Sequence, residues 1–273
     1  MPQVSVILPS WNRAGWLKKS IDSVLEQTFR DFELIVVDDA STDSTQEILT
    51  GYSGKIRSIT FAKNLGVSAA RNAAIKNCDS EWIAFLDSDD FWHPDKLQKQ
   101  IAQTVIRTEC PIHFTDEIWI RNGVRVNPKK KHQKLDGWIF KPSLELCLIS
   151  PSTVLLKREL FEVHGLFDEN LAICEDYDLW LRLTAQHKVA LLSEKLMTRH
   201  GGHSDQLSWS DWGIDRYRVQ SIIKILKTEK LRPQDRSAAI VVLLKKCRII
   251  INGFRKRGKL EEVEKYEKIV NEY

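Results

Sequence analysis

The chain has 273 residues, of which 42% are hydrophobic and 29% charged, enough apolar material for one large domain with an appendage. Its longest apolar run near the C-terminus, residues 238–244, is too short to span a bilayer, which needs about 20 apolar residues. The first residues show neither a basic leader nor a cleavage site. We therefore expect a cytoplasmic protein that is not integral to a membrane.

Cysteine and charge distributions refine this expectation. The five cysteines are odd in number and never two residues apart, so free thiols are expected rather than a metal knuckle or a redox pair. Residues 1–213 hold 25 Lys and Arg against 29 Asp and Glu, whereas residues 214–273 hold 16 against 8. Such a basic tail suits peripheral contact with the inner face of a membrane, but a solvated helical face carries the same residues. No nucleic-acid partner is expected.

The first 110 residues alternate strand-like and helix-like patterns. Apolar runs predict strands at Val4–Leu8, Phe32–Val37, Ile56–Phe61 and Trp82–Leu86. The segments between them carry apolar residues at helical spacing. Repeated strand-helix-strand units predict an α/β fold with a mostly parallel, doubly wound sheet.

After residue 110 the pattern changes. Asn122-Gly123 predicts a two-residue hairpin turn within Pro111–Val126. The remaining expected elements are a loop at Pro128–Lys134, strands at Pro151–Lys157 and Val189–Leu192, and helices at Asp176–Ala185, Ile214–Lys227, Pro233–Asn252 and Leu260–Asn271. We predict one large domain over residues 1–213, with a change of pattern near residue 110, followed by a basic helical extension over 214–273.

Acidic clusters mark the chemistry. Asp38-Asp39 follows the second predicted strand, Asp87-Ser88-Asp89-Asp90 follows the fourth, and Glu175-Asp176 precedes a helix. Ligands bind beyond the carboxyl ends of strands in open α/β sheets, so we expect the aspartates at the strand ends to share one cleft. Carboxylates crowded together favour Mg²⁺ or Mn²⁺, and the natural companion of such an ion is a diphosphate. Asp43 is better explained as a cap of the next turn.

Five segments in order, VSVILPSWNR, FELIVVDDASTDST, NLGVSAARNAAI, WIAFLDSDDFWHPDKL and GLFDENLAICEDYDLWLRL, resemble family 2 glycosyltransferases. The resemblance covers roughly residues 1–205 and implies that residues 1–213 form a catalytic domain, with a nucleotide-binding half (1–110) and an acceptor half (111–213). It implies a glycosyltransferase A fold and the metal-dependent, inverting transfer of a sugar from a nucleoside-diphosphate sugar, most often a UDP-sugar, to a carbohydrate or lipid-linked acceptor. An oligomer stays open, and the last 60 residues are not explained by the resemblance.

The resemblance also implies roles on the nucleotide side. Pro9 and Trp11 correspond to positions that cradle the base, with the indole stacking on it. Asp39 corresponds to a carboxylate that receives a base N–H, and Arg71 to a cation that faces the diphosphate. Trp11 stands where the family usually has Tyr.

Further implied roles concern the ribose and the metal. In the Asp-x-Asp motif formed by Asp87, Ser88 and Asp89, the first residues lie near the nucleotide and Asp89 holds the cation. A late histidine joins the metal or the diphosphate in related enzymes. His203 is our choice for that position, with His200 as the alternative.

Asp176 corresponds to the catalytic base that takes the acceptor's proton. Glu175 is the second candidate for the base, or else positions the acceptor or the helix. We interpret Asp178 as structural. Among the tryptophans, Trp82 and Trp180 are expected in the core, and four are candidates for contact with acceptor sugars: Trp92, Trp138, Trp209 and Trp212.

Two other functions share these features. A non-catalytic nucleotide-sugar-binding protein would keep the fold without the reaction, but the intact Asp-x-Asp and Glu-Asp pairs argue against it. A sugar nucleotidyltransferase would also use a metal and an α/β sheet, yet it calls for a Gly-rich phosphate loop after the first strand. That position here reads PSWNRAGW.

Overall fold

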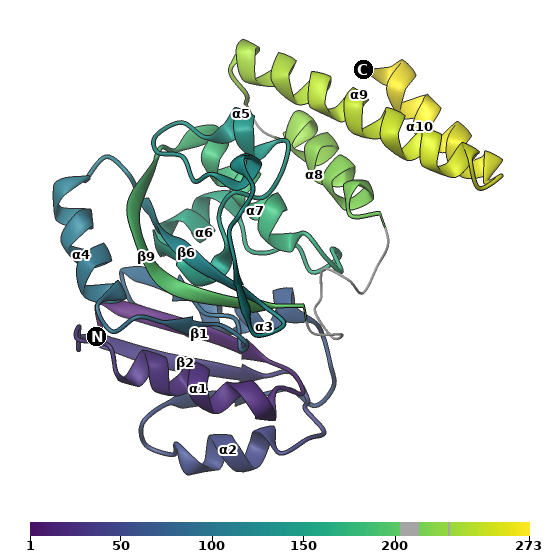
Figure 1. Cartoon of the computed structure of the whole chain (residues 1–273). Coiled ribbons are helices and arrows are strands. Elements are labelled where there is room, and N and C mark those ends of the chain that lie inside the picture. Colours follow the sequence, from purple (N-terminus) through teal and green to yellow (C-terminus); the bar gives the residue numbers. More distant parts are fainter. Residues whose placement is uncertain (203–212, 229) are drawn as a thin grey trace.

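The structure is a computed structural model that describes residues 1–202, 213–228 and 230–273. Figure 1 shows a mixed sheet flanked by helices, with further helices at the C-terminal end. In chain order the elements are β1 (Val4–Ser10), α1 (Ala14–Leu25), β2 (Phe32–Asp38), α2 (Thr45–Gly51), β3 (Arg57–Thr60), α3 (Val67–Lys76), β4 (Trp82–Phe85), β5 (Phe91–Trp92), α4 (Lys96–Ile106), β6 (Ile112–Arg121), β7 (Val124–Val126), η1 (Lys130–His132), α5 (Phe140–Ser143), η2 (Pro151–Thr153), β8 (Val154–Lys157), α6 (Glu159–His164), α7 (Glu175–Gln186), β9 (Val189–Gly201), α8 (Asp215–Thr228), α9 (Pro233–Arg255) and α10 (Leu260–Glu272).

The first four predicted strands form a parallel sheet in the order β3-β2-β1-β4. Alternate residues of β1, β2 and β4 enter two different apolar clusters, as Ile7 of β1 packs with α3 and its neighbours Val6 and Leu8 pack with α1. A strand buried on both faces needs a continuous apolar run rather than a polar alternation. The doubly wound α/β arrangement is thereby confirmed for this half of the molecule.

The second half of the sheet is mixed. β8 runs antiparallel to both β4 and β6, whereas β6 and β9 are parallel and shift register near Asp116. β9 extends to Gly201, far beyond the expected strand at 189–192, because it continues to pair with β6 and also with β5. The predicted hairpin turn is confirmed, with Asn122 at φ 49° and Gly123 at φ 76°.

Two of the expected segments differ locally from the prediction. The segment at 128–134, expected as a loop, contains the short helix η1. The strand expected from Pro151 begins only at Val154, since residues 151–153 form one turn of 3₁₀-helix. Proline lacks the N–H that a ladder requires and is suited to the first turn of a helix.

The three predicted C-terminal helices are confirmed as α8, α9 and α10. α9 and α10 form a helical hairpin, and α8 lies between α9 and α7 (Figure 1). Within the described residues, none of the helices combines the length and the apolar character that crossing a bilayer requires. Their apolar residues join those of α5 and α7 in one cluster.

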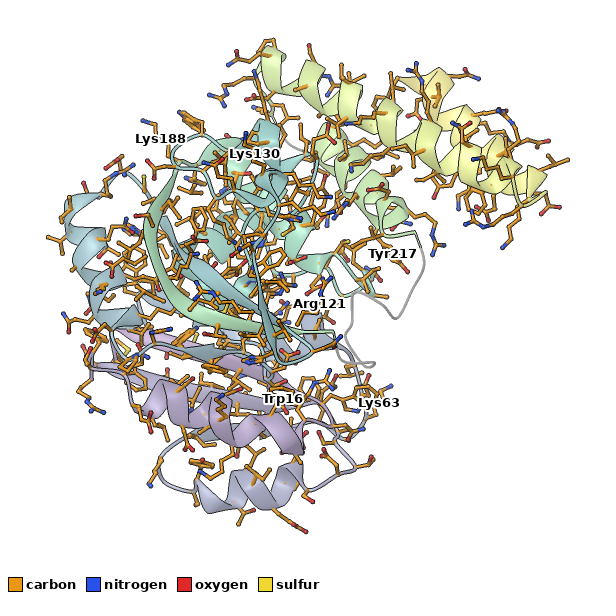
Figure 2. The ribbon with its side chains drawn as sticks, viewed as in Figure 1. Trp16, Lys63, Arg121, Lys130, Lys188 and Tyr217 are labelled. Carbon is orange, nitrogen blue, oxygen red and sulfur yellow. The ribbon has the colours of Figure 1, made fainter. Side chains whose placement is uncertain are left out.

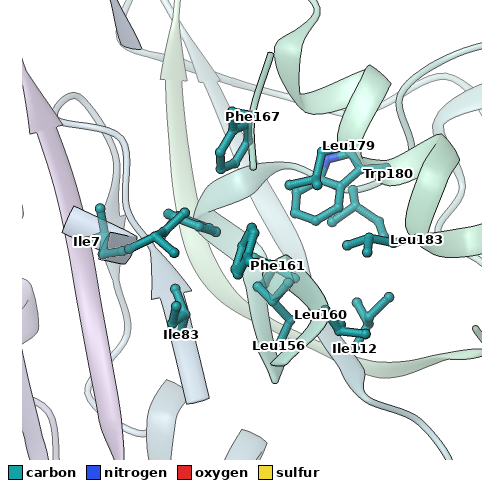
Figure 3. Close-up of a cluster of buried hydrophobic side chains, with 14 of the residues drawn as sticks. Ile7, Ile83, Ile112, Leu156, Leu160, Phe161, Phe167, Leu179, Trp180 and Leu183 are labelled. Atoms are coloured by element: carbon teal, nitrogen blue, oxygen red, sulfur yellow. The ribbon is translucent and has the colours of Figure 1, made fainter. Parts of the chain in front are cut away.

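A core cluster fixes the helix that carries Glu175 and Asp176. Figure 3 shows Phe161 and Phe167 between the sheet strands and α7, with Trp180 of α7 among them. Phe167 meets Phe85 of β4 edge to face, with ring centroids 5.4 Å apart. This packing holds the first turn of α7 toward the carboxyl ends of β1 and β4.

Candidate active site

The end of β1 presents an exposed tryptophan from a braced turn. Pro9 is buried in β1, while half of the Trp11 surface is exposed (50%). The next residue, Asn12, accepts a hydrogen bond from the Thr42 backbone N–H at 2.7 Å and donates its own to the Ser41 hydroxyl at 2.9 Å. These hydrogen bonds fix the turn next to Trp11 at the end of β1, and half of the Trp11 surface stays exposed there.

Asp39 ties the strand end to the loop that precedes α3. Its two carboxylate oxygens accept the backbone N–H groups of Leu65 at 2.7 Å and Gly66 at 2.8 Å, and the residue is 3% exposed. Asp38 is fully buried and accepts the Ser41 N–H and the Gln46 side chain, so it does not join the cleft.

Asp43 braces the same region from the surface. Its carboxylate accepts the N–H groups of Ala14 and Thr45, the first residues of α1 and α2. The capping interpretation of Asp43 is therefore confirmed.

One buried arginine joins two of the acidic clusters. Arg71 of α3 donates to Asp87 and to Glu175, each at 2.7 Å, and its side chain is 3% exposed. Its guanidinium carbon also lies 5.1 Å from the Phe167 ring centroid. Burial opposes the charge of Arg71, but the two carboxylates outweigh it and raise the pKa.

The surroundings of Glu175 in this bridge raise the pKa of its carboxyl group. Burial, followed by the charge of Asp176, raises the pKa of Glu175 to about 7, and Arg71 acts in the opposite direction. Arg71 lowers the pKa of Glu175 but does not fully offset the effect of its burial. The bridge therefore connects the carboxyl end of β4 with the start of α7.

The acidic turn after β4 is held from below by two serines. Ser152 accepts the Asp87 N–H at 3.0 Å and donates to the Asp90 carboxylate at 2.7 Å, while the Ser20 hydroxyl lies 2.9 Å from the Ser88 carbonyl oxygen. Asp90 is 3% exposed, and burial followed by Asp89 and Asp87 raises its pKa well above the usual value.

These contacts separate the roles of the aspartates in the turn. Asp90 is a structural residue that also accepts the His200 N–H at 3.0 Å. Ser88 is buried, and its side chain faces away from bulk solvent. Asp87 and Asp89 are partly exposed, so their oxygens are the ones that a ligand can reach.

Asp176 is the second residue of α7 and is partly exposed. One carboxylate oxygen accepts the Tyr177 N–H at 2.7 Å, and the other lies 3.4 Å from the Cys147 sulfur. Asp178 instead points away into an ion pair with Arg182 at 3.0 Å and another with Lys224 at 3.1 Å. The structural interpretation of Asp178 is confirmed.

Sequence reasoning missed a group of charged and aromatic side chains centred on β6 and β9. Trp119 and Arg199 are register partners, and the guanidinium lies 5.7 Å from the indole centroid. Glu117 accepts the Trp119 indole N–H at 2.8 Å and pairs with Lys134 at 3.2 Å. Burial opposes the charge of Arg199, but Glu117, Asp90, Asp87 and Asp176 raise its pKa. Nothing in the local sequence pattern reveals this group, because its contacts depend on the register between β6 and β9.

The predicted roles of His200 and His203 at the metal site stay predictions. His203 lies outside the described residues. The His200 ring packs against Trp16 and Phe91, with centroids 5.2 and 4.7 Å away. Over the residues that the structure describes, no group of three or more His, Cys, Asp or Glu side chains is arranged to hold a metal ion.

The structure tests the predicted positions of four of the tryptophans. Trp82 and Trp180 are buried in the core, as predicted. Contact of Trp92 with acceptor sugars is wrong, because the residue is 3% exposed and its indole N–H donates to the Ser152 carbonyl at 2.7 Å. Trp138 is 46% exposed and stacks with Arg232. Trp209 and Trp212 lie outside the described residues.

Figure 2 gives the surroundings of these groups. Lys63, Arg121 and Tyr217 lie on the side of the molecule toward which β1 and β2 run. They come from the segment before α3, from the end of β6 and from α8.

Comparison with known proteins gives a consistent result. The family model described as Glycosyl transferase family 2 matches residues 5–154. The glucosyltransferase WfgD of Escherichia coli, named for UDP-Glc and α-D-GlcNAc-diphosphoundecaprenol, is 34% identical over 70% of this chain and 73% of its own length. The putative teichuronic acid biosynthesis glycosyltransferase TuaG of Bacillus subtilis is 29% identical over 77% and 83%. The chain spans only 32% and 58% of two uncharacterized glycosyltransferases from Rickettsia felis and Rickettsia typhi.

Solved structures match in fold. Staphylococcus aureus TarS 1–349 in complex with UDP-GlcNAc aligns over 99% of this chain and 92% of its own, with a TM-score of 0.68 and 18% identity. The mannosyltransferase PcManGT from Pyrobaculum calidifontis, in complex with GDP-Man and Mn²⁺, aligns over 99% and 83% with a TM-score of 0.66 and 16% identity. These likenesses support the predicted fold class, a glycosyltransferase A fold with C-terminal helices.

Proposed function

Because the chain belongs to glycosyl transferase family 2, we propose that it transfers a sugar from a nucleoside-diphosphate sugar to an acceptor hydroxyl, with a divalent cation and with inversion at the anomeric carbon. The observation that carries the proposal is the Arg71 bridge, which joins the acidic turn after β4 to the start of α7. Donor-side and acceptor-side carboxylates thereby share one edge of the sheet.

On the donor side, the exposed indole of Trp11 stacks on the nucleotide base, beside the buried Pro9. Stacking on an aromatic face tolerates any base, so the donor nucleotide is chosen by other groups, and a UDP-sugar is the proposed one. Asp39 orders the loop before α3 and keeps lone pairs for a base N–H. Arg71 contributes its charge to the diphosphate from behind Asp87.

The metal proposal rests on the donor set. Asp87 and Asp89 offer carboxylate oxygens that are partly exposed, which are the ligands that Mn²⁺ and Mg²⁺ prefer. Asp89 would hold the ion, with His203 as a further ligand. When bound, the cation neutralises charge on the departing diphosphate.

On the acceptor side, Asp176 takes the proton of the acceptor hydroxyl. The acceptor oxygen forms a bond to the anomeric carbon as the bond from that carbon to the diphosphate oxygen breaks, and the nucleoside diphosphate leaves with the bonding pair. Attack opposite the leaving group inverts the configuration. Glu175 is less suited to act as the base, because it is buried and paired with Arg71.

The experiment tests Asp176→Asn with UDP-glucose, UDP-N-acetylglucosamine and GDP-mannose as donors and the lipid acceptor named for the E. coli relative, after a thermal-shift panel with and without Mn²⁺. Transfer should fall about 10² to 10⁴-fold while donor binding persists, because the amide keeps its shape but cannot take a proton. The exposed Glu162→Gln serves as control. Full transfer by Asp176→Asn would move the base to Glu175, and pyrophosphate release from a nucleoside triphosphate would indicate a nucleotidyltransferase.

A second part of the proposal is peripheral contact of the helical extension with anionic lipid. The solvent-facing side of α9 carries Val241 (65% exposed) and Ile249 (53%) near the exposed Arg248, and residues 214–273 as a whole hold 16 Lys and Arg against 8 Asp and Glu. Exposed apolar residues among cations suit the surface of a bilayer. Arg248→Glu should reduce sedimentation with phosphatidylserine vesicles relative to wild type, and equal sedimentation would remove α9 from the contact.

A further inference from the structure

The segment at residues 144–149, which follows α5, lies against the proposed catalytic base without forming a helix or strand. Its backbone carbonyls are bound instead by side chains from three other parts of the chain. The Leu144 carbonyl accepts the Tyr177 hydroxyl at 2.7 Å, the Glu145 carbonyl accepts Lys246 at 3.0 Å, and the Leu148 carbonyl accepts Lys134 at 2.9 Å. Buried carbonyls need such donors, so the segment has one preferred position.

Cys147 lies in the middle of this segment and contacts the base. Its sulfur is 3.4 Å from a carboxylate oxygen of Asp176 and 3.2 Å from the Ile149 carbonyl oxygen. Burial, with Asp176 next to it, raises the pKa of the Cys147 thiol well above its usual value. The thiol therefore keeps its proton, which the Ile149 carbonyl and the Asp176 carboxylate share as acceptors.

Lys246 connects the segment to the C-terminal helices. Its side chain is 4% exposed and donates both to the Glu145 carbonyl and to Asp215 of α8, the latter at 2.9 Å. Asp215 also pairs with Arg218 at 3.1 Å. One buried ammonium group on α9 thus holds both the segment beside the base and the start of α8.

The helices themselves pack on the second face of the base-bearing helix. Tyr177 and Leu181 of α7 share a buried cluster with Ile222 of α8 and Leu243 of α9. Figure 1 shows α8 lying between α7 and the α9-α10 hairpin. Cys147 contacts both this cluster and the cluster beneath the sheet. Residues 214–273 therefore share a core with the helix that carries Asp176.

We propose that the C-terminal helices position the catalytic base, with Lys246 and Cys147 as the positioning residues. Lys246 fixes the segment at 144–149, and Cys147 on that segment orients the Asp176 carboxylate. The inference rests on the proposed role of Asp176 as base. It gives the extension a function in acceptor activation that is separate from its contact with lipid.

Two pairs of variants test the proposal. Lys246→Met keeps the aliphatic stem but removes the donor. Its neighbour Lys245→Met is the matched control, because Lys245 is 57% exposed and, among the described residues, pairs with the Glu145 side chain. Cys147→Ala removes the thiol donor, and Cys147→Ser restores one. Each variant is prepared in the full chain.

We expect Lys246→Met and Cys147→Ala to lower kcat about 10-fold or more, since small displacements of a catalytic group are costly, while the affinity for UDP with Mn²⁺ stays within about 2-fold. Lys245→Met and Cys147→Ser should stay within about 3-fold of the wild-type kcat. Hydrogen exchange of amides in 144–149 and 174–178 should accelerate in Lys246→Met only.

The following outcomes would contradict the proposal that the C-terminal helices position the base. Wild-type kcat and exchange in Lys246→Met would remove the helices from base positioning, and Cys147→Ser as slow as Cys147→Ala would remove the thiol. Asp176→Asn, measured in parallel, separates this inference from its premise: full transfer by that variant refutes the base, whereas its loss with unchanged Lys246→Met and Cys147→Ala refutes only the positioning.

Discussion

The sharpest structural prediction concerns the buried Arg71 bridge. Arg71→Met keeps most of the side-chain volume but leaves Asp87 and Glu175 without their shared cation. Without Arg71 the buried Glu175 is either charged and desolvated or protonated and deprived of its partner, and breaking a buried ion pair by removing one partner costs about 3 to 5 kcal/mol. At roughly 2 to 4 °C per kcal/mol for a chain of this size class, thermal unfolding should begin about 10 °C lower.

A matched pair elsewhere in the chain provides the control. Arg57 lies the same 2.7 Å from Glu33, but its side chain is 53% exposed. Exposed ion pairs contribute about 0 to 1 kcal/mol, so Arg57→Met should leave the unfolding temperature nearly unchanged. Urea unfolding of both variants gives the two free energies.

The double variant Arg71→Met/Glu175→Gln tests the cause. Arg71 holds the pKa of Glu175 down, so without it Glu175 is charged only at alkaline pH. There the amide removes one of the two unpaired charges, and stability should recover in part. An Arg71→Met protein as stable as wild type would refute the bridge as a stabilising element. A double variant less stable than Arg71→Met would show that the loss does not come from the unpaired Glu175 charge.

Three further predictions follow from the site and the core. Asp89→Ala should abolish Mn²⁺-dependent turnover and weaken UDP binding, and unchanged turnover in a metal titration would remove Asp89 from the metal site. Trp11→Ala should weaken nucleotide affinity by about 1 to 3 kcal/mol in calorimetry, whereas equal affinity would exclude stacking. Burial lowers the pKa of His113 to about 4, so the folded chain favours the neutral imidazole. This preference contributes to the free energy of unfolding above the unfolded pKa of 6.5, and the contribution is lost as the pH falls through about 4. That contribution is about 3 kcal/mol. His113→Gln should therefore flatten the fall in unfolding free energy over this pH range, as urea unfolding at several pH values measures. An equally steep fall in both proteins would show that His113 is already protonated in the folded chain.

Much of the site was visible in the sequence because its signals are local. Continuous apolar runs identify strands buried on both faces, and the carboxyl ends of such strands in a parallel sheet face one edge. Asp39 and the turn at 87–90 could therefore be assigned to that edge from the strand pattern alone. The three C-terminal helices were equally readable from their spacing.

Only the tertiary structure decided which of these residues touch. The Arg71–Glu175 contact joins residues 104 apart in sequence, and the Cys147–Asp176 contact and the Trp119–Arg199 pair depend on loop closure and on the β6-β9 register. Trp92 was a candidate for contact with acceptor sugars, but its indole packs into the core and donates to the Ser152 carbonyl. Local periodicity encodes an element and its buried face, but the partner of a polar side chain is chosen by long-range register and packing, which no local pattern contains.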